Sequence, residues 1–297
     1  MDQVVGDEVQ QKSSGDTSNA AVLALAHCAM LFAPAELRFP LSRRLQYFPD
    51  SRLTDLAQTG MSGGEELRLK TADGETLVAW YFTPKDGRPL ILYFHVNGGA
   101  LVDRVPRFRL FTARGYDVLA VSYRDYGGST GSPTETGLLQ DGEAAYREAC
   151  SRGFDGYRIV LIGASLGTGV AAALAARHKA TALVLEAPYL SALDVASAHY
   201  PFFPVSRLML DQFRSDLANR EAHVPVFMVH REKDFVIPIS SGRRLFELAN
   251  EPKTFVSVPG DEHLVLDLVD VFPRVCEWID ARTPLGRLLV DCRSAVS

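Results

Sequence analysis

The sequence has few cysteines and no stripe of basic residues, and each shortage excludes a class of protein. Only four cysteines occur in 297 residues, and none form a C-x-x-C pair: Cys28, Cys150, Cys276 and Cys292. This spacing predicts neither a metal site nor a disulfide framework. The net charge is −5, and no cluster of Lys and Arg stands out, so we expect no nucleic-acid partner.

The sequence also lacks an apolar run of the length that membrane spans usually have, about 20 residues. The nearest candidate is the run from Ala20 to Phe32, and the residues before it are mainly acidic, which disfavours a cleaved signal peptide. An anchor would keep the main domain in the cytoplasm, because Arg38, Arg43 and Arg44 follow it. A packed or surface-bound helix is the other interpretation. We therefore expect a cytoplasmic protein and leave open a weak membrane association through residues 20–33.

Beyond this segment the chain alternates predicted strands with predicted helices. Hydrophobic residues make up 47% of the sequence, enough for one large α/β domain. The pattern predicts a mostly parallel central sheet of about eight strands with helices on both faces. We expect residues 61–283 to form this domain, with a small lid inserted at about 189–219. Residues 1–60 and 284–297 are predicted to be an N-terminal segment with a connector and a C-terminal tail. A last helix is predicted from Leu264 to Arg282, kinked at Pro273.

One stretch organises the predicted domain. The apolar strand from Ile159 to Ile162 is followed by Gly163, Ser165 and Gly167 in the pattern G-x-S-x-G, and then by an alanine-rich helix. A strand that turns sharply into a helix holds such a serine in a strained conformation above the sheet. The turn brings backbone segments so close together that only glycine fits on either side. Ser165 is therefore the candidate nucleophile.

A serine nucleophile needs a base and a group that orients the base. Among the seven histidines we choose His263, which lies in a loop after the last predicted strand; the competing interpretation is a solvated loop histidine. Asp234 is the preferred orienting acid, because it gives the chain order Ser, Asp, His, although it could be an ordinary turn aspartate. Glu186 ends the preceding strand and is the alternative acid, unless it only makes local hydrogen bonds.

The developing oxyanion needs two N–H donors. Leu166 follows the nucleophile directly and supplies one. The other is expected from the glycine-containing loop after the strand at 89–95, where Asn97 is the first choice and Val96 the second. A plain turn between a strand and a helix is the simpler interpretation of that loop.

The same region admits a nucleotide-binding interpretation. Residues 167–172 match G-x-G-x-x-A, and Glu186 ends the next strand. In that fingerprint, however, the first glycine closes the strand, whereas Gly167 comes after Ser165. We therefore favour the nucleophile and expect no bound cofactor.

With these motifs in view, residues 65–281 resemble the α/β-hydrolase superfamily. The matching segments are 92–95, 122–129 and 163–167, together with Gly260 and His263. They are most similar to small-lid serine hydrolases, which include membrane-anchored esterases, protein depalmitoylases and lysolipid lipases. The resemblance implies Ser165 as nucleophile, Asp234 as acid and His263 as base, with Asn97 and Leu166 as oxyanion donors.

The chain departs from that family at three positions. Val96 and Arg231 stand where glycine is usual, and Leu264 stands where the family often has a polar residue. The resemblance implies no metal and no organic cofactor. The expected function is hydrolysis of a small carboxylic ester or thioester through an acyl-enzyme on Ser165, with the lid covering an apolar acyl pocket. Two alternatives stay open: a serine peptidase acting on short peptides, and a hydrolase fold without catalysis that serves in binding.

Overall fold

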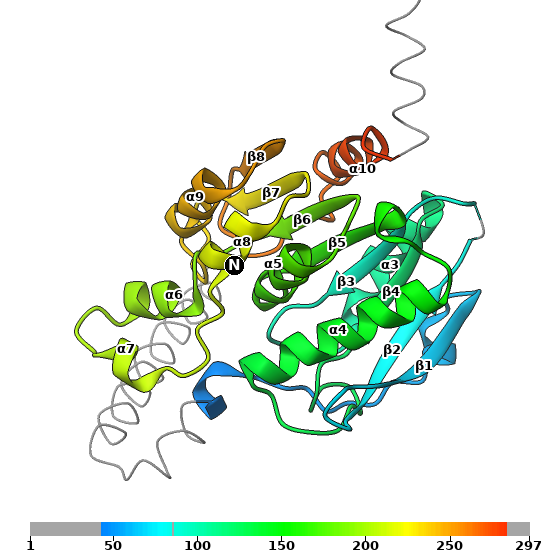
Figure 1. The fold of residues 1–297 in the computed structure, drawn as a ribbon, viewed down its shortest axis with the longest axis horizontal. Coiled ribbons are helices and arrows are strands. Elements are labelled where there is room, and N and C mark those ends of the chain that lie inside the picture. Colours follow the sequence, from blue (N-terminus) through cyan, green and yellow to red (C-terminus); the bar gives the residue numbers. More distant parts are fainter. Residues whose placement is uncertain (1–42, 85, 284–297) are drawn as a thin grey trace, which may run out of the picture.

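The computed structural model describes residues 43–84 and 86–283, and their strands form a single eight-stranded sheet (Figure 1). The order across the sheet is β1-β2-β4-β3-β5-β6-β7-β8. Only β2 runs antiparallel to its neighbours, and the other pairings are parallel. The predicted mostly parallel sheet is confirmed. The strands are β1 (Gly64–Lys70), β2 (Thr76–Phe82), β3 (Leu90–Phe94), β4 (Asp117–Val121), β5 (Ile159–Ala164), β6 (Ala182–Glu186), β7 (Val226–Arg231) and β8 (Lys253–Val258).

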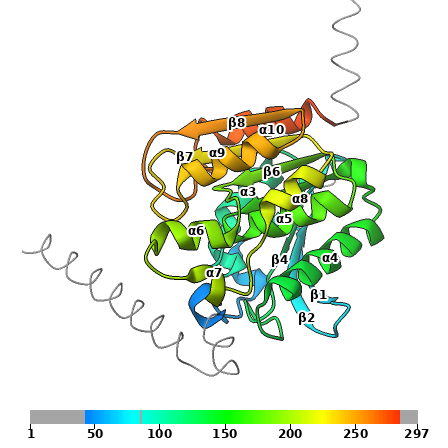
Figure 2. The same ribbon diagram turned by 60° about the vertical axis from the view of Figure 1, so that its left-hand side comes forward.

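Helices cover both faces of this sheet (Figure 2). Helices α4, α5 and α9 pack on one face, and α3 and α10 pack on the other. The helices are α3 (Val105–Ala113), α4 (Glu135–Ser151), α5 (Leu166–Arg177), α6 (Ala192–His199), α7 (Val205–Leu208), α8 (Ser215–Glu221), α9 (Ile239–Leu248) and α10 (Phe272–Asp280), with 3-10 turns η1 (Leu56–Thr59), η2 (Leu101–Arg104) and η3 (Gly156–Arg158).

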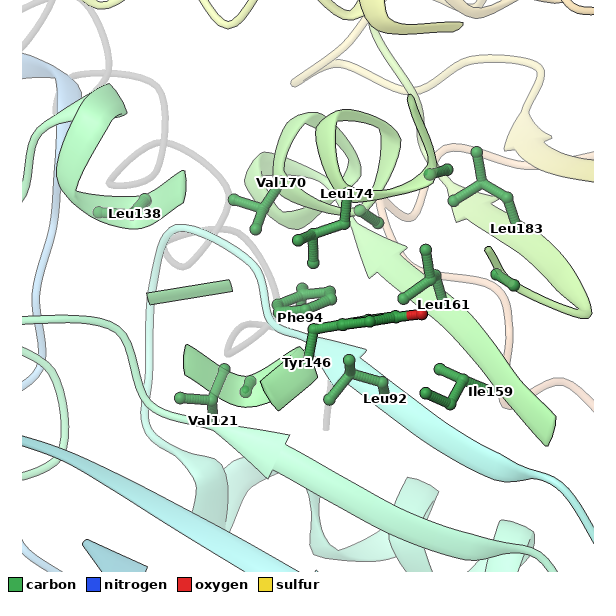
Figure 3. Packing of buried hydrophobic residues seen from close by; sticks show 14 of the residues in the cluster. Leu92, Phe94, Val121, Leu138, Tyr146, Ile159, Leu161, Val170, Leu174 and Leu183 are labelled. Atoms are coloured by element: carbon green, nitrogen blue, oxygen red, sulfur yellow. The ribbon is translucent and has the colours of Figure 1, made fainter. Parts of the chain in front are cut away.

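The central strands are largely apolar because both of their faces are covered. Every residue of β3 is buried. Its Leu92 and Phe94 point into the cluster under α4 and α5, while Ile91 and Tyr93 join the cluster under α3 and α10. Figure 3 shows the first cluster, in which Leu161 of β5 packs near Leu92. Continuous apolar runs of this kind are typical of buried parallel strands.

The predicted insertion contains α6, α7 and α8, which lie between β6 and β7 in the chain. Figures 1 and 2 show α7 beside the helical residues 43–46. Arg43 forms a 3.0 Å ion pair with Asp211, and the Tyr47 hydroxyl donates to the same carboxylate at 3.1 Å. The segment before the domain is therefore joined to the insertion.

The apolar segment at 20–33 and the predicted tail at 284–297 lie outside the described residues. Within residues 43–84 and 86–283, no helix has both the length and the apolarity that crossing a membrane requires.

One predicted helix is wrong in extent. The helix expected from Leu264 begins only at Phe272, and Pro273 occupies its first turn instead of kinking its middle. Proline is tolerated there because a first-turn N–H has no partner within the helix. The preceding N–H groups of Val265 and Leu266 donate instead to the side chain of Glu186, at 2.7 and 2.6 Å. A contact with a distant residue thus replaces the first turns of the predicted helix.

Candidate active site

Ser165 occupies the turn between β5 and α5 with φ 51° and ψ −117°. A residue other than glycine in such a sparsely populated region costs about 1–3 kcal/mol. Backbone hydrogen bonds hold the turn: the Ser165 N–H donates to the Glu186 carbonyl at 2.9 Å, and the Thr168 N–H donates to the Ser165 carbonyl at 2.9 Å. The sharp strand-to-helix turn predicted from G-x-S-x-G is confirmed.

The two flanking glycines are required by close backbone contacts. A Cβ at Gly163 would overlap the carbonyl oxygen of Gly167, and a Cβ at Gly167 would overlap that of Phe94 in β3. Gly167 therefore serves the packing of α5 against the sheet. This packing contact explains why residue 167 is glycine, so the nucleotide-binding motif is not needed to explain it.

The structure brings Asp234 and His263 together. Asp234 Oδ2 lies 2.7 Å from His263 Nδ1, and Asp234 Oδ1 accepts the N–H groups of Val236 and Ile237 at 2.8 and 3.0 Å. Asp234 follows β7, and His263 follows β8. Burial alone would raise the pKa of Asp234, but hydrogen bonds from His230 and His263 outweigh it and hold the pKa well below the ordinary carboxyl range. The carboxylate is therefore ionised and accepts the Nδ1–H proton of His263.

This pairing leaves the second ring nitrogen of His263 available. Its Nε2 is buried and has no hydrogen-bond partner within the described residues. With the proton on Nδ1, Nε2 carries the lone pair and can accept a proton. Within the same residues, no hydrogen bond joins Nε2 to the Ser165 hydroxyl. Such contacts are often long in enzymes without substrate and tighten in the complex.

The predicted oxyanion donors lie on two neighbouring elements. Leu166 is the first residue of α5, so its N–H has no partner within the helix. The side chain of Asn97 is already engaged: its amide donates to the Gln46 carbonyl at 2.7 Å, and its Oδ1 accepts the Phe48 N–H at 3.2 Å. Asn97 can therefore serve as a donor only through its backbone N–H, which makes no hydrogen bond within the described residues.

Neutral hydrogen bonds hold the part of the loop around Asn97, whereas Arg104 and Asp103 bind Gly98 and Ala100 further along it. The Tyr126 hydroxyl lies 3.0 Å from both the Asn97 carbonyl oxygen and Oδ1. His95 is buried, with Nδ1 2.7 Å from the Val96 carbonyl and Nε2 3.4 Å from the Tyr123 N–H. Since the Tyr123 N–H can only donate, Nε2 accepts and Nδ1–H donates. Burial lowers the pKa of His95 to about 4, which keeps its ring neutral near pH 7.

Val96, which stands where the family usually has glycine, adopts an ordinary backbone conformation. The residues other than glycine with positive φ in the described chain are Asp125, Ser165, Ala187 and Phe213. The valine therefore introduces no backbone strain at this loop.

Glu186, the alternative acid, contacts a different set of groups. It is fully buried, and its carboxylate faces the Arg107 guanidinium, with Oε2 2.5 Å from Nη1 and Oε1 3.1 Å from Nη2. Burial by itself would raise the pKa of Glu186, but Arg107 and two backbone amides lower it. Its Oε1 accepts the N–H groups of Val265 and Leu266, as described above. The structure thus pairs the imidazole of His263 with Asp234, and Glu186 with the segment after His263.

Arg231 contacts the loop that carries His263, residues 259–263, which we call the histidine loop. Its Nη2 pairs with Glu262 at 2.5 Å, and its Nη1 donates to the Pro259 carbonyl. An arginine in place of the usual glycine therefore links the end of β7 to the residues just before His263.

The family follows from a comparison with known proteins. A family model described as the alpha/beta hydrolase family matches residues 91–295, which is well over half of the chain. The protein belongs to the alpha/beta hydrolase family. This membership supports hydrolase activity and agrees with the fold.

Two individual proteins are similar in sequence to this chain. The chain is 37% identical over 234 residues to the Mycobacterium tuberculosis protein Rv2307c. The alignment covers 77% of this chain and 82% of that protein. It is 29% identical over 260 residues to the lysophosphatidylserine lipase ABHD12 of Danio rerio, covering 74% of this chain and 67% of the relative.

A solved structure shares the fold of this hydrolase. The Pyrococcus furiosus esterase Pf2001 aligns with a TM-score of 0.60 at 16% identity, covering 83% of this chain and 98% of the esterase. At that identity the likeness is one of fold alone.

Two side chains support the site although the sequence analysis does not predict it. His230 Nε2 lies 2.9 Å from the Ile237 carbonyl and 3.4 Å from Asp234 Oδ2, so it helps to hold the turn that carries Asp234. Arg107 holds Glu186 from α3. The only indication in the sequence is that Glu186 ends an otherwise apolar strand, where a buried carboxylate needs a cation. The identity of that cation cannot be inferred from local sequence, because Arg107 is 79 residues away.

Proposed function

We propose that this protein is a serine hydrolase that cleaves carboxylic esters or thioesters through an acyl-enzyme on Ser165. The observation that carries the proposal is the 2.7 Å contact between Asp234 and His263 Nδ1, which leaves His263 Nε2 buried and unpaired. The strained Ser165 turn follows β5, which belongs to the same parallel part of the sheet as β7 and β8. A serine, an imidazole and a carboxylate with these roles make up a hydrolytic triad.

In the proposed reaction Ser165 Oγ attacks the carbonyl carbon of the substrate. His263 Nε2 takes the hydroxyl proton and then gives it to the leaving alcohol or thiol, while Asp234 keeps the other proton on Nδ1. The N–H groups of Leu166 and Asn97 stabilise the negative charge on the carbonyl oxygen. Water then attacks the acyl carbon while His263 takes its proton. The bond between the acyl carbon and Ser165 Oγ breaks, His263 returns the proton to Oγ, and the carboxylic acid leaves.

An acylated small molecule is the substrate class that the relatives favour. The Danio rerio relative is named a lysophosphatidylserine lipase, and the Pyrococcus furiosus neighbour is named an esterase. Exposed apolar side chains on the lid and next to Asp234 support an apolar acyl group, since Phe202 is 96% exposed and Phe235 is 71% exposed.

Replacement of Ser165 by alanine tests the proposal. We expect kcat for p-nitrophenyl esters to fall by several powers of ten, about 10⁴-fold or more, because no nucleophile remains. A fluorophosphonate probe should label the wild type and leave the variant unlabelled. Ser122→Ala is the matched control, since Ser122 is also buried and also follows a strand.

Unchanged ester hydrolysis in Ser165→Ala, or labelling at another residue, would overturn the assignment. Comparison with aminoacyl anilides separates an esterase from a peptidase, and a series of acyl chain lengths defines the pocket.

A further inference from the structure

Glu186 contacts both segments that carry the proposed reacting groups. Its carbonyl oxygen accepts the Ser165 N–H at 2.9 Å. Its side-chain Oε1 accepts the N–H groups of Val265 and Leu266 at 2.7 and 2.6 Å. These amides lie two and three residues after His263. One residue of β6 therefore holds the turn of Ser165 through its backbone and the segment after His263 through its side chain.

Arg107 keeps this carboxylate charged inside the protein. Arg107 and Glu186 are 2% and 0% exposed, and a charge buried at this depth is strongly destabilising unless it is paired. The guanidinium faces both carboxylate oxygens, at 2.5 and 3.1 Å, and its Nε donates to Asp267 Oδ1 at 2.6 Å. Arg107 Nη1 also donates to the Tyr93 hydroxyl at 3.1 Å. The donors around Glu186 thus come from α3 and from the segment before α10.

We propose that Glu186 is a positioning residue that sets the separation between Ser165 and His263. The inference rests on the proposed function, and it gives Glu186 a role other than that of the alternative acid. Asp234 orients the ring of His263, while Glu186 fixes the chain that carries His263 relative to the nucleophile turn. A displacement of about 1 Å between reacting groups can lower the rate about 100-fold.

The test replaces the ion pair as a unit, since loss of one partner alone would leave an unpaired buried charge. In Arg107→Met/Glu186→Gln, the glutamine oxygen can still accept the amides of Val265 and Leu266. In Arg107→Met/Glu186→Met, the side chain has a similar length and no such acceptor. Exchange of a buried ion pair for apolar groups is often neutral for stability, so the two variants form a matched pair.

We expect the glutamine variant to keep kcat for p-nitrophenyl esters within about tenfold of the wild type. The methionine variant should lose about 100-fold in kcat with little change in KM. The low-field proton resonance of the His263 Nδ1–H, recorded without substrate, should persist in the glutamine variant and shift or broaden in the methionine variant. Equal kcat and equal spectra in the two variants would refute the inference.

Glu186→Asp provides a second measurement should the methionine variant fail to fold. It keeps the charge and the Arg107 partner but shortens the side chain by one methylene group. We expect a fall in kcat of about tenfold at unchanged KM, and wild-type kcat in this variant would contradict the inference.

The two proposals can fail separately. Absence of ester hydrolysis and of Ser165 labelling in the wild type would remove the proposed function. The resonance of His263 would still report whether Glu186 controls the position of the histidine loop.

Discussion

The loops on either side of the nucleophile are held by different forces. Around Asn97, the loop after β3 is fixed by neutral groups, namely His95 and the Tyr126 hydroxyl. Charged side chains bind this loop only further along, where Arg104 contacts the Gly98 carbonyl and Asp103 accepts the Ala100 N–H. The loop after β8, which carries His263, is fixed by charged groups, namely Asp234, Glu186 and Arg231. In the proposed reaction, the first loop presents only a backbone N–H, whereas the second carries the side chain that accepts a proton and returns it.

Asp234→Asn should produce the largest effect. An amide in place of the carboxylate no longer stabilises the imidazolium and can hold His263 in the wrong tautomer, so kcat should fall about 10⁴-fold. Ester hydrolysis under saturating substrate measures it. Asp280→Asn is the control, because that carboxylate pairs with Arg88, which precedes β3 at the end of the sheet opposite to His263. If Asp234→Asn kept a tenth of the activity, the carboxylate of Asp234 would not be needed to orient and charge-stabilise His263, and the prediction would be wrong.

His95, which ends the strand before the Asn97 loop, should limit the stability of the protein in acid. The folded-state pKa of His95 is about 4, against about 6.5 in an unfolded chain. Between these values the unfolded state binds the proton and the folded state does not, so stability falls as the pH drops from 6.5 to 4. The shift corresponds to a loss of about 3 kcal/mol.

Urea unfolding at pH 7.5 and pH 4.5 measures this effect. His95→Asn keeps a side-chain N–H donor without a group that titrates in this range, so its stability should depend less on pH. An equal pH dependence in the variant and the wild type would show that acid acts on another part of the molecule.

Tyr126→Phe should produce the smallest of these effects. Loss of the hydroxyl removes the hydrogen bond that holds the Asn97 peptide, which is worth about 1 kcal/mol. We expect kcat to fall about fivefold with KM nearly unchanged, measured by steady-state ester hydrolysis. In the control Tyr146→Phe, the lost hydroxyl contacts the Lys179 carbonyl, away from the site, and kcat should not change. A comparable fall in both variants would mean that Tyr126 acts only through stability.

Local sequence predicts the sheet and the turn of Ser165 well, because both depend on nearby residues. Continuous apolar runs identify the buried strands, and G-x-S-x-G identifies a turn in which both glycines avoid backbone overlap. Asp234 and His263 are chosen by their positions after strands and by chain order. The structure brings them into contact, and their catalytic role remains a proposal.

The features that escape prediction depend on contacts between distant parts of the chain. Residues from Leu264 onward have a helical pattern, but Glu186 takes the N–H groups of Val265 and Leu266, and the helix begins later. The side chain of Asn97 binds Gln46 and Phe48, about fifty residues earlier in the chain. No local pattern specifies such partners, because tertiary contacts override propensity.

The backbone of Ser165 places a limit on how stable this chain can become. At φ 51° a serine is strained, whereas glycine adopts such a conformation freely. Ser165→Gly should therefore raise Tm by a few degrees while it abolishes hydrolysis, which differential scanning calorimetry can measure against Ser165→Ala, where the strain remains. Under the proposed function, the serine at this turn therefore exchanges part of the chain's heat resistance for reactivity.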